Sequence, residues 1–130
     1  VASGENIFNH WQYRDLITRG RVDIIQPDIV KTGGFTEFRR IAALASAFNK
    51  PITVHNIQPT VSAVAHLHAC AAFQNIPYSQ EYNIEPISIR DESPILKDPL
   101  VVKDGYLKVP DGPGLGIELD ESMIERLRGA

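Results

Sequence analysis

Four side chains capable of acid–base or metal-binding chemistry recur at regular intervals in this sequence, namely Glu5, Asp28, His55 and Glu81. Consecutive members lie 23, 27 and 26 residues apart, which is close to the length of one strand–helix unit. A carboxylate can bind a divalent cation or hold a histidine in one tautomer, and an imidazole can act as a general base near neutral pH. Each residue alone has a structural explanation: Asp28 as a helix cap or turn residue, and His55 as a structural histidine. Glu5 could be an acid at a helix N-terminus, and Glu81 could pair with an arginine. Only their common register favours a functional site.

The segments around these residues alternate between expected strands and expected helices. Short apolar or β-branched runs predict strands over residues 22–26 and 51–54, and a weaker one over 78–82. Apolar residues at helical spacing predict helices over 11–19, 35–49 and 60–73. This alternation predicts a parallel sheet, and either a (β/α) barrel or an open doubly wound sheet fits it. In both folds the C-terminal ends of the strands carry the active site, which is where the four side chains would lie.

The last third of the chain has a different pattern. Two apolar runs, 100–103 and 106–109, flank Asp104-Gly105, which predicts a β-hairpin. Asp120 is expected to cap a short C-terminal helix, with arginines near its end.

Composition excludes several classes of partner. The 130 residues are 43% hydrophobic and 22% charged, and 13 Lys+Arg against 16 Asp+Glu give a net charge of −3. Without a basic run there is no electrostatic footprint for nucleic acid or an anionic membrane. The weakly polar stretch 59–73 is shorter than the ~20 residues that cross a bilayer. A single cysteine, Cys70, excludes an internal disulfide, so we expect a reducing, cytoplasmic location.

His66 and His68 could suggest a metal site, but residues two apart point to different sides of a helix. We therefore favour a structural role for both histidines. Cys70 shares a helical face with His66 and is interpreted as a small buried apolar residue.

Five segments of the chain carry a family resemblance: ASGEN at 2–6, DIIQPDIVKTGGFTEFRRIAALA at 23–45, ITVHN at 52–56, QEY at 80–82 and VPDGPGLGIELDE at 109–121. With them the chain resembles the C-terminal part of enzymes of the mandelate racemase subgroup of the enolase superfamily. Within that subgroup it is most similar to the acid-sugar dehydratases of the galactonate and gluconate type.

The resemblance implies a fold. Residues 1–98 would be the last four units, about the fifth to the eighth, of a modified TIM (β/α) barrel. Residues 99–130 would form a hairpin and a helix that pack on the N-terminal capping domain of the full-length protein, for which a homo-oligomer is expected.

The resemblance also implies roles. Glu5 would be one carboxylate ligand of Mg²⁺, and His55, assisted by Asp28, would remove the proton α to the carboxylate of a sugar acid. Glu81 would act best as a protonated acid that donates a hydrogen bond to the developing oxyanion. Loss of water would then give a 2-keto-3-deoxy acid. A racemase or epimerase of a 2-hydroxy acid is the alternative, because it begins with the same step.

The remaining metal ligands of such an enzyme lie outside this chain. One carboxylate does not hold Mg²⁺ effectively in water, because the ion gives up its hydration shell reluctantly. The 130 residues alone are therefore expected to be inactive, and to expose two open sheet edges. An alternative of another class is a noncatalytic fragment or pseudoenzyme that keeps the fold as an assembly surface.

Overall fold

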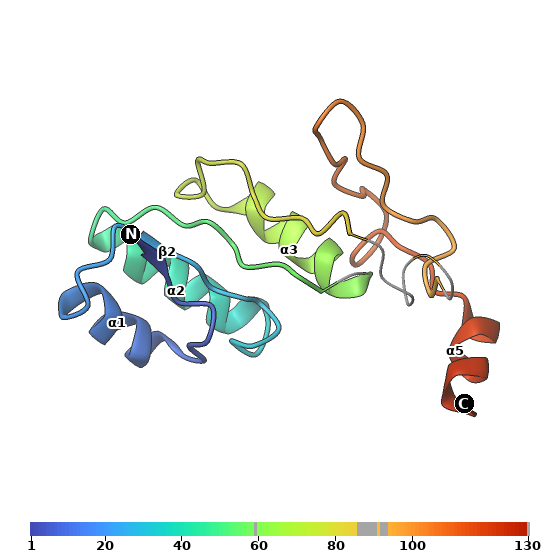
Figure 1. The fold of residues 1–130 in the computed structure, drawn as a ribbon, viewed down its shortest axis with the longest axis horizontal. Coiled ribbons are helices and arrows are strands. Elements are labelled where there is room, and N and C mark those ends of the chain that lie inside the picture. Colours follow the sequence, from blue (N-terminus) through green and yellow to red (C-terminus); the bar gives the residue numbers. More distant parts are fainter. Residues whose placement is uncertain (59, 86–90, 92–93, 130) are drawn as a thin grey trace.

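A computed structural model describes residues 1–58, 60–85, 91 and 94–129 of the chain. Figure 1 shows α1, α2 and the strands at the N-terminal end, α3 in the middle and α5 at the C-terminal end. The strands are β1 (Ala2–Ser3) and β2 (Ile24–Ile25). The helices are α1 (His10–Thr18), α2 (Phe35–Ala47), α3 (Val61–Ala72) and α5 (Glu121–Arg128).

The extended segments form a parallel sheet in chain order. β1 pairs with β2 in the register Ala2↔Ile24 and Ser3↔Ile25. On its other side Ile25 makes a parallel bridge to Ile52, and the Ile52 N–H donates to the carbonyl of Asn75 at 2.8 Å. Neighbours in the sheet are thus successive units of the chain, as they are in a (β/α) barrel. All the C-terminal ends of these segments consequently lie at one edge.

The helices begin and end within two residues of their predicted limits, because local signals define them. The side chain of Asn9 accepts a hydrogen bond from Gln12 N–H and caps α1. Asp120 caps α5 in the same way by accepting from Met123 N–H, as expected. At α2 the cap is Gly34, whose φ of 98° favours glycine.

One apolar core joins the strands to the first three helices. Tyr13 of α1, Phe38 of α2 and Ala69 of α3 are buried in it. The extended segments contribute Ile25, Ile52 and Val54. Burying each large apolar side chain contributes roughly 1.5–3 kcal/mol, so this cluster fixes the helices to the sheet.

Most of the predicted strands are shorter in the structure or absent from it. The strand predicted over 22–26 is limited to Ile24–Ile25, and the one over 51–54 to a single bridge at Ile52. Residues 78–82 form no strand ladder, since the side chains of Gln80 and Glu81, rather than their backbone, bind the N–H groups of Val54 and Asn56. The predicted hairpin is reduced to one bridge, Lys103↔Tyr106.

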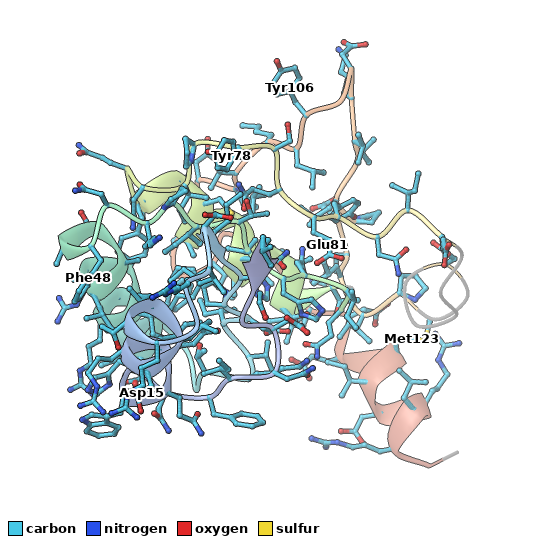
Figure 2. The ribbon with its side chains drawn as sticks, turned by 60° about the vertical axis from the view of Figure 1, so that its left-hand side comes forward. Asp15, Phe48, Tyr78, Glu81, Tyr106 and Met123 are labelled. Atoms are coloured by element: carbon cyan, nitrogen blue, oxygen red, sulfur yellow. The ribbon has the colours of Figure 1, made fainter. Side chains whose placement is uncertain are left out.

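The missing hairpin ladder has a physical reason. The turn has the positive φ angles that Asp104-Gly105 predicts, but the flanking residues have no sheet to pack against, and an isolated two-stranded hairpin is marginal in water. Figure 2 shows Tyr106 on the loop that contains this turn, which extends from the rest of the molecule.

The C-terminal part is attached instead by an antiparallel bridge between Leu96 and Leu119, next to the hydrogen bond from Asp120 N–H to the Ile95 carbonyl. The domain division after residue 98 stays a prediction. No helix among the described residues has the length and apolarity needed to cross a membrane.

Candidate active site

His55 and Asp28 form the centre of the candidate site. They follow neighbouring extended segments at the C-terminal edge of the sheet, and His55 Nδ1 lies 3.0 Å from Asp28 Oδ2. The Asp28 carboxylate is an acceptor, so the Nδ1–H of the imidazole donates to it, which leaves Nε2 as the basic nitrogen. Asp28 is 1% exposed, whereas the side chain of His55 is 14% exposed. The buried carboxylate thus orients an imidazole that solvent or substrate can reach.

The second oxygen of Asp28 binds the backbone that follows it. Oδ1 accepts hydrogen bonds from the N–H groups of Val30 at 2.8 Å and Lys31 at 3.3 Å. This is the local turn that an aspartate after a strand commonly makes. Here the turn and the histidine contact use different oxygens, so the two interpretations of Asp28 in the sequence are compatible.

His66 of α3 lies on the buried side of Asp28. It is 1% exposed, and its Nε2 accepts the N–H of Ile29 at 3.0 Å. Its Nδ1 donates to the Ser62 carbonyl at 2.8 Å. Nε2 also lies 3.5 Å from Asp28 Oδ1, but a nitrogen that accepts a backbone N–H carries no proton, so this contact is no ion pair. Burial is the main cause that lowers the pKa of His66 and keeps it neutral.

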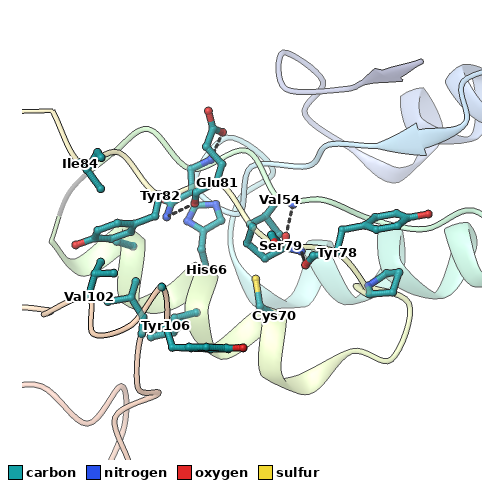
Figure 3. Close-up of a pocket in the computed structure, with 17 residues that line it drawn as sticks. Val54, His66, Cys70, Tyr78, Ser79, Glu81, Tyr82, Ile84, Val102 and Tyr106 are labelled. Atoms are coloured by element: carbon teal, nitrogen blue, oxygen red, sulfur yellow. Dashed lines mark hydrogen bonds between the residues drawn. The ribbon is translucent and has the colours of Figure 1, made fainter.

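Glu81 is held by Asn56, the residue next to His55. The backbone N–H of Asn56 donates to Glu81 Oε2 at 2.9 Å, and its side-chain amide donates to the Glu81 carbonyl at 3.3 Å. Asn56 is 5% exposed, and its Oδ1 is buried without a hydrogen-bond partner in the described part of the chain. Figure 3 shows the Glu81 carboxylate above His66, directed away from the apolar side chains of Tyr82 and Val102.

Glu5 follows β1 at the same edge. The backbone N–H of Gly4 donates to its Oε2 at 3.1 Å, and the Gly4 carbonyl accepts the hydroxyl of Tyr13 at 2.7 Å. Hydrogen bonds from the Glu5 and Gly4 backbone lower the pKa of the Glu5 carboxyl, and the charges of His55 and Lys31 lower it further. Glu5 is therefore ionised near neutral pH, as a metal ligand must be.

The charges of the predicted residues act on the pKa values of Glu5 and of two neighbouring groups, Tyr13 and His66. The charge of His55 acts on Glu5, while Asp28 and Glu5 both act on Tyr13, whose pKa is raised mainly by burial. Asp28, His55 and Glu81 each act on the pKa of His66. The structure thus brings His55 and Asp28 into contact and places Glu5 within electrostatic reach of His55, whereas Glu81 is connected to them through Asn56, the neighbour of His55.

The donor set fits one part of a magnesium site. Glu5 provides an ionised oxygen ligand of the kind Mg²⁺ prefers. Within the described ranges no three His, Cys, Asp or Glu side chains group closely enough to hold a metal ion. Among the described residues, Glu5 is the carboxylate that the resemblance predicts as a ligand, and its ionised state suits that role.

A cavity of about 470 Å³ lies behind these residues. Asn56, His66 and Glu81 reach it, whereas most of its wall is α3, residues 77–84 and the turn at 102–107. Figure 3 shows Cys70 and Tyr106 at this wall. Glu5, Asp28 and His55 do not line the cavity, so we do not assign it to the chemistry of the site.

Sequence spacing did not identify Asn56 or Lys31. Lys31 Nζ donates to Asn6 Oδ1 at 3.1 Å and lies within electrostatic reach of Glu5. Asn56 is adjacent to His55, and this adjacency is the signal that could have marked it.

Comparisons with known proteins show what the chain as a whole is similar to. A family profile described as enolase C-terminal domain-like matches residues 1–123. The D-xylonate dehydratase of Haloferax volcanii is 30% identical over 96% of this chain and 30% of that protein. The D-galactarolactone cycloisomerase of Agrobacterium fabrum is 34% identical over 98% of this chain and 35% of that protein. The chain thus spans about a third of the length of these relatives.

Solved structures show the same fold. A mandelate racemase/muconate lactonizing protein from Paracoccus denitrificans, complexed with magnesium, superposes with a TM-score of 0.86 at 32% identity. The match covers 97% of this chain and 33% of that one. The 3,6-anhydro-D-galactonate cycloisomerase of Zobellia galactanivorans gives a TM-score of 0.84 at 30% identity, over 96% of this chain and 34% of the other.

Proposed function

The chain belongs to the enolase C-terminal domain-like family, and from that premise we propose that it is the C-terminal barrel segment of a Mg²⁺-dependent acid-sugar dehydratase. In this proposal residues 1–98 are the last four units of a modified TIM barrel, and 99–130 contact a capping domain. The substrate is a sugar acid, and the reaction converts it to a 2-keto-3-deoxy acid and water.

The observation that carries the proposal is the hydrogen bond between His55 Nδ1 and Asp28 Oδ2. A buried carboxylate on one imidazole nitrogen fixes the tautomer and makes the other nitrogen more basic. His55 Nε2 is therefore the general base that takes the proton from C2 of the sugar acid. The partial exposure of His55 lets a substrate approach it.

Glu81 is proposed to stabilise the charge that develops on the substrate carboxylate. A neutral carboxylic acid donates a hydrogen bond to such an oxyanion. The Asn56 N–H occupies Oε2, so the proton to be donated would sit on Oε1. Asn56 orients this acid through two hydrogen bonds while the adjacent His55 carries the base.

Glu5 would be this chain's ligand to Mg²⁺. When bound, Mg²⁺ supplies Lewis-acid stabilisation of the enolate-like charge formed by proton removal. Glu5 meets the requirement for an ionised oxygen donor, because backbone hydrogen bonds lower the pKa of its carboxyl.

The proposed reaction is balanced within the substrate. The C2–H bond breaks and its proton goes to His55, then the C3–O bond breaks and the hydroxide leaves. The proton and the hydroxide together account for the released water. The enol that remains tautomerises to the 2-keto-3-deoxy acid, so no oxidant or reductant is required.

Support for dehydration comes from the names of relatives: D-xylonate, arabinonate, D-gluconate and D-galactonate dehydratases are all about 30% identical to this chain. Cycloisomerases occur among the relatives as well. Racemisation or epimerisation of a 2-hydroxy acid is the second candidate, because proton removal by the same His55–Asp28 pair would initiate it. A cytoplasmic location and a homo-oligomer also remain proposals.

The experiment uses the full-length protein that the gene encodes. The four sugar acids named above are incubated with it, with and without Mg²⁺ and after treatment with a chelator. We expect a 2-keto acid from at least one substrate, lost with the chelator and restored by Mg²⁺. If an epimer were the only product, the reaction would be epimerisation. If a lactone were the only product, it would be cycloisomerisation. No reaction of any substrate, and no exchange of its C2 proton, would favour the noncatalytic alternative.

A further inference from the structure

The loop that carries Asp28 is fixed to α3 by a histidine that the proposed reaction does not use. His66 is 1% exposed, and both of its ring nitrogens are engaged, Nε2 with Ile29 N–H at 3.0 Å and Nδ1 with the Ser62 carbonyl at 2.8 Å. Ile29 directly follows Asp28. The imidazole therefore connects the helix to the backbone next to the residue that orients His55.

Three successive backbone N–H groups after Asp28 are bound by side chains. His66 accepts the N–H of Ile29, and Asp28 Oδ1 accepts those of Val30 and Lys31. With both ends of the turn bound, the carboxylate cannot rotate without breaking hydrogen bonds. Its remaining oxygen, Oδ2, consequently stays directed at His55 Nδ1.

The unprotonated state of His66 is part of this arrangement. Nε2 lies 3.5 Å from Asp28 Oδ1, so a proton there would lose the Ile29 N–H and form an ion pair with Asp28. The charged or titratable groups that act on His66 are Asp28, His55 and Glu81. Because Nε2 accepts a backbone N–H, the charge of Asp28 remains available to His55.

We propose that His66 is a positioning residue for the Asp28–His55 pair: by accepting the N–H of Ile29 it holds the Asp28 carboxylate in the orientation that keeps the proton of the neutral His55 ring on Nδ1 and leaves Nε2 free to act as the base. The inference rests on the proposed function of that pair. This role goes beyond that of a buried core histidine, because a change at His66 should then alter the tautomer of His55 even when the protein still folds.

Two variants at position 66 and one control test the inference in the protein with every residue its gene encodes. His66→Leu removes the acceptor for Ile29 N–H, and His66→Gln restores a side-chain acceptor. His68→Gln is the control, since His68 lies on the same helix and contacts the Leu115 carbonyl at 3.0 Å rather than the site. The readouts are the low-field proton resonance of His55 Nδ1–H, kcat, KM and the pH dependence of kcat/KM.

We expect His66→Leu to lose or shift the His55 resonance and to lower kcat by about 10–100-fold, the range for residues that orient a functional group. KM should change little. The pH dependence of kcat/KM should differ from that of the wild type, because the carboxylate that orients the imidazole is no longer held in place. His66→Gln should recover most of these properties, and His68→Gln should match the wild type. A folded His66→Leu protein with the wild-type resonance and pH profile would overturn the inference.

If His66→Leu does not fold, as judged by near-UV circular dichroism, the inference is tested by NMR on the wild-type protein. A ¹⁵N scalar coupling across the hydrogen bond from Ile29 N to His66 Nε2, with Nε2 unprotonated throughout the active pH range, would support the inference. Protonation of Nε2 or absence of the coupling would overturn it. The resonances do not depend on turnover, so a protein that converts no sugar acid would disprove the proposed function and leave this test intact.

Discussion

Asp28 uses its two oxygens for different purposes, and the chemistry of the site depends on that division. Oδ1 binds the backbone of its own turn, and Oδ2 binds the Nδ1 of His55. Asn56 makes a comparable division, since its backbone and its side chain bind two different groups of Glu81. In the proposed reaction the base and the acid are thus each oriented by a neighbouring residue.

Asp28→Asn tests the first of these contacts. An amide can still accept the turn N–H groups through its oxygen, but its NH₂ then faces His55 and favours the tautomer protonated on Nε2. We expect kcat for C2 proton removal to fall by about 10²–10⁴-fold, as for loss of a general base. Steady-state kinetics measure this, with the midpoint of thermal unfolding as a check that the fold persists. A variant within a few-fold of wild-type kcat would contradict the orienting role.

Asn56→Ala tests the second contact. The change removes the 3.3 Å hydrogen bond to the Glu81 carbonyl and also removes a buried oxygen that has no partner in the described residues. Because these effects oppose each other, the free energy of unfolding should change by less than about 1 kcal/mol. We expect kcat to fall several-fold while stability is nearly unchanged, as measured by kinetics and urea unfolding. A large loss of stability without a kinetic effect would show that Asn56 acts on folding alone.

At the scale of elements, Glu37 connects the first turns of α1 and α2. Its Oε1 accepts the backbone N–H of His10 at 2.7 Å, and its Oε2 accepts from Arg40 at 3.1 Å. The hydrogen bond from the His10 backbone is the main cause that lowers the pKa of Glu37 to about 2. The carboxylate thus stabilises the packing of two helices whose N-terminal ends face the site edge.

Glu37→Gln should lower the free energy of unfolding by about 1 kcal/mol at neutral pH, where the charge-assisted hydrogen bonds are lost. A lowered pKa stabilises the fold above the ordinary value of 4.5, and this stabilisation is lost as pH falls toward about 2. The variant should lack that part of the acid dependence. Urea unfolding between pH 2 and 7 measures both effects.

Glu125→Gln is the matched control for this experiment. Glu125 forms an exposed pair with Arg128 on α5 at 2.6 Å, and such surface pairs contribute little. Equal acid dependence in wild type and Glu37→Gln would refute the role of Glu37.

The elements were predictable where the signal is local. Helix limits follow from apolar spacing and caps such as Asn9 and Asp120. The conformation of residues 78–82 could not be predicted in this way, because Gln80 and Glu81 replace backbone pairing with side-chain hydrogen bonds. In the site, the contact of His55 with Asp28 follows from strand ends that share one edge, whereas the contacts of Asn56 and His66 depend on which N–H groups meet them in three dimensions.

At the scale of the whole molecule, the buried core and the most exposed apolar side chains lie in different parts of the chain. Its core is continuous from α1 to α3. The chain nevertheless covers about a third of its relatives. Large apolar side chains such as Ile84, Val101 and Tyr106 are more than two-thirds exposed. Under the proposed function, further residues of such an enzyme would cover these side chains and complete the site.

Residues 1–130 alone should therefore bind Mg²⁺ weakly. Glu5 provides one carboxylate, and the ion retains most of its water unless several ligands replace it. Isothermal titration calorimetry of the 130-residue chain and of its Glu5→Gln variant should give indistinguishable, millimolar or weaker affinities. Tight binding that depends on Glu5 would show that the described residues complete the metal site without further segments.

The central claim is that His55, oriented by Asp28, removes the C2 proton of a sugar acid. Its most direct test is proton NMR of the substrate in D₂O with the protein encoded by the whole gene, comparing wild type with His55→Asn. We predict that the wild type replaces the C2 hydrogen by deuterium or releases 2-keto product, and that His55→Asn does neither, although it folds and binds Mg²⁺ like the wild type. Undiminished exchange or turnover by His55→Asn would contradict the account.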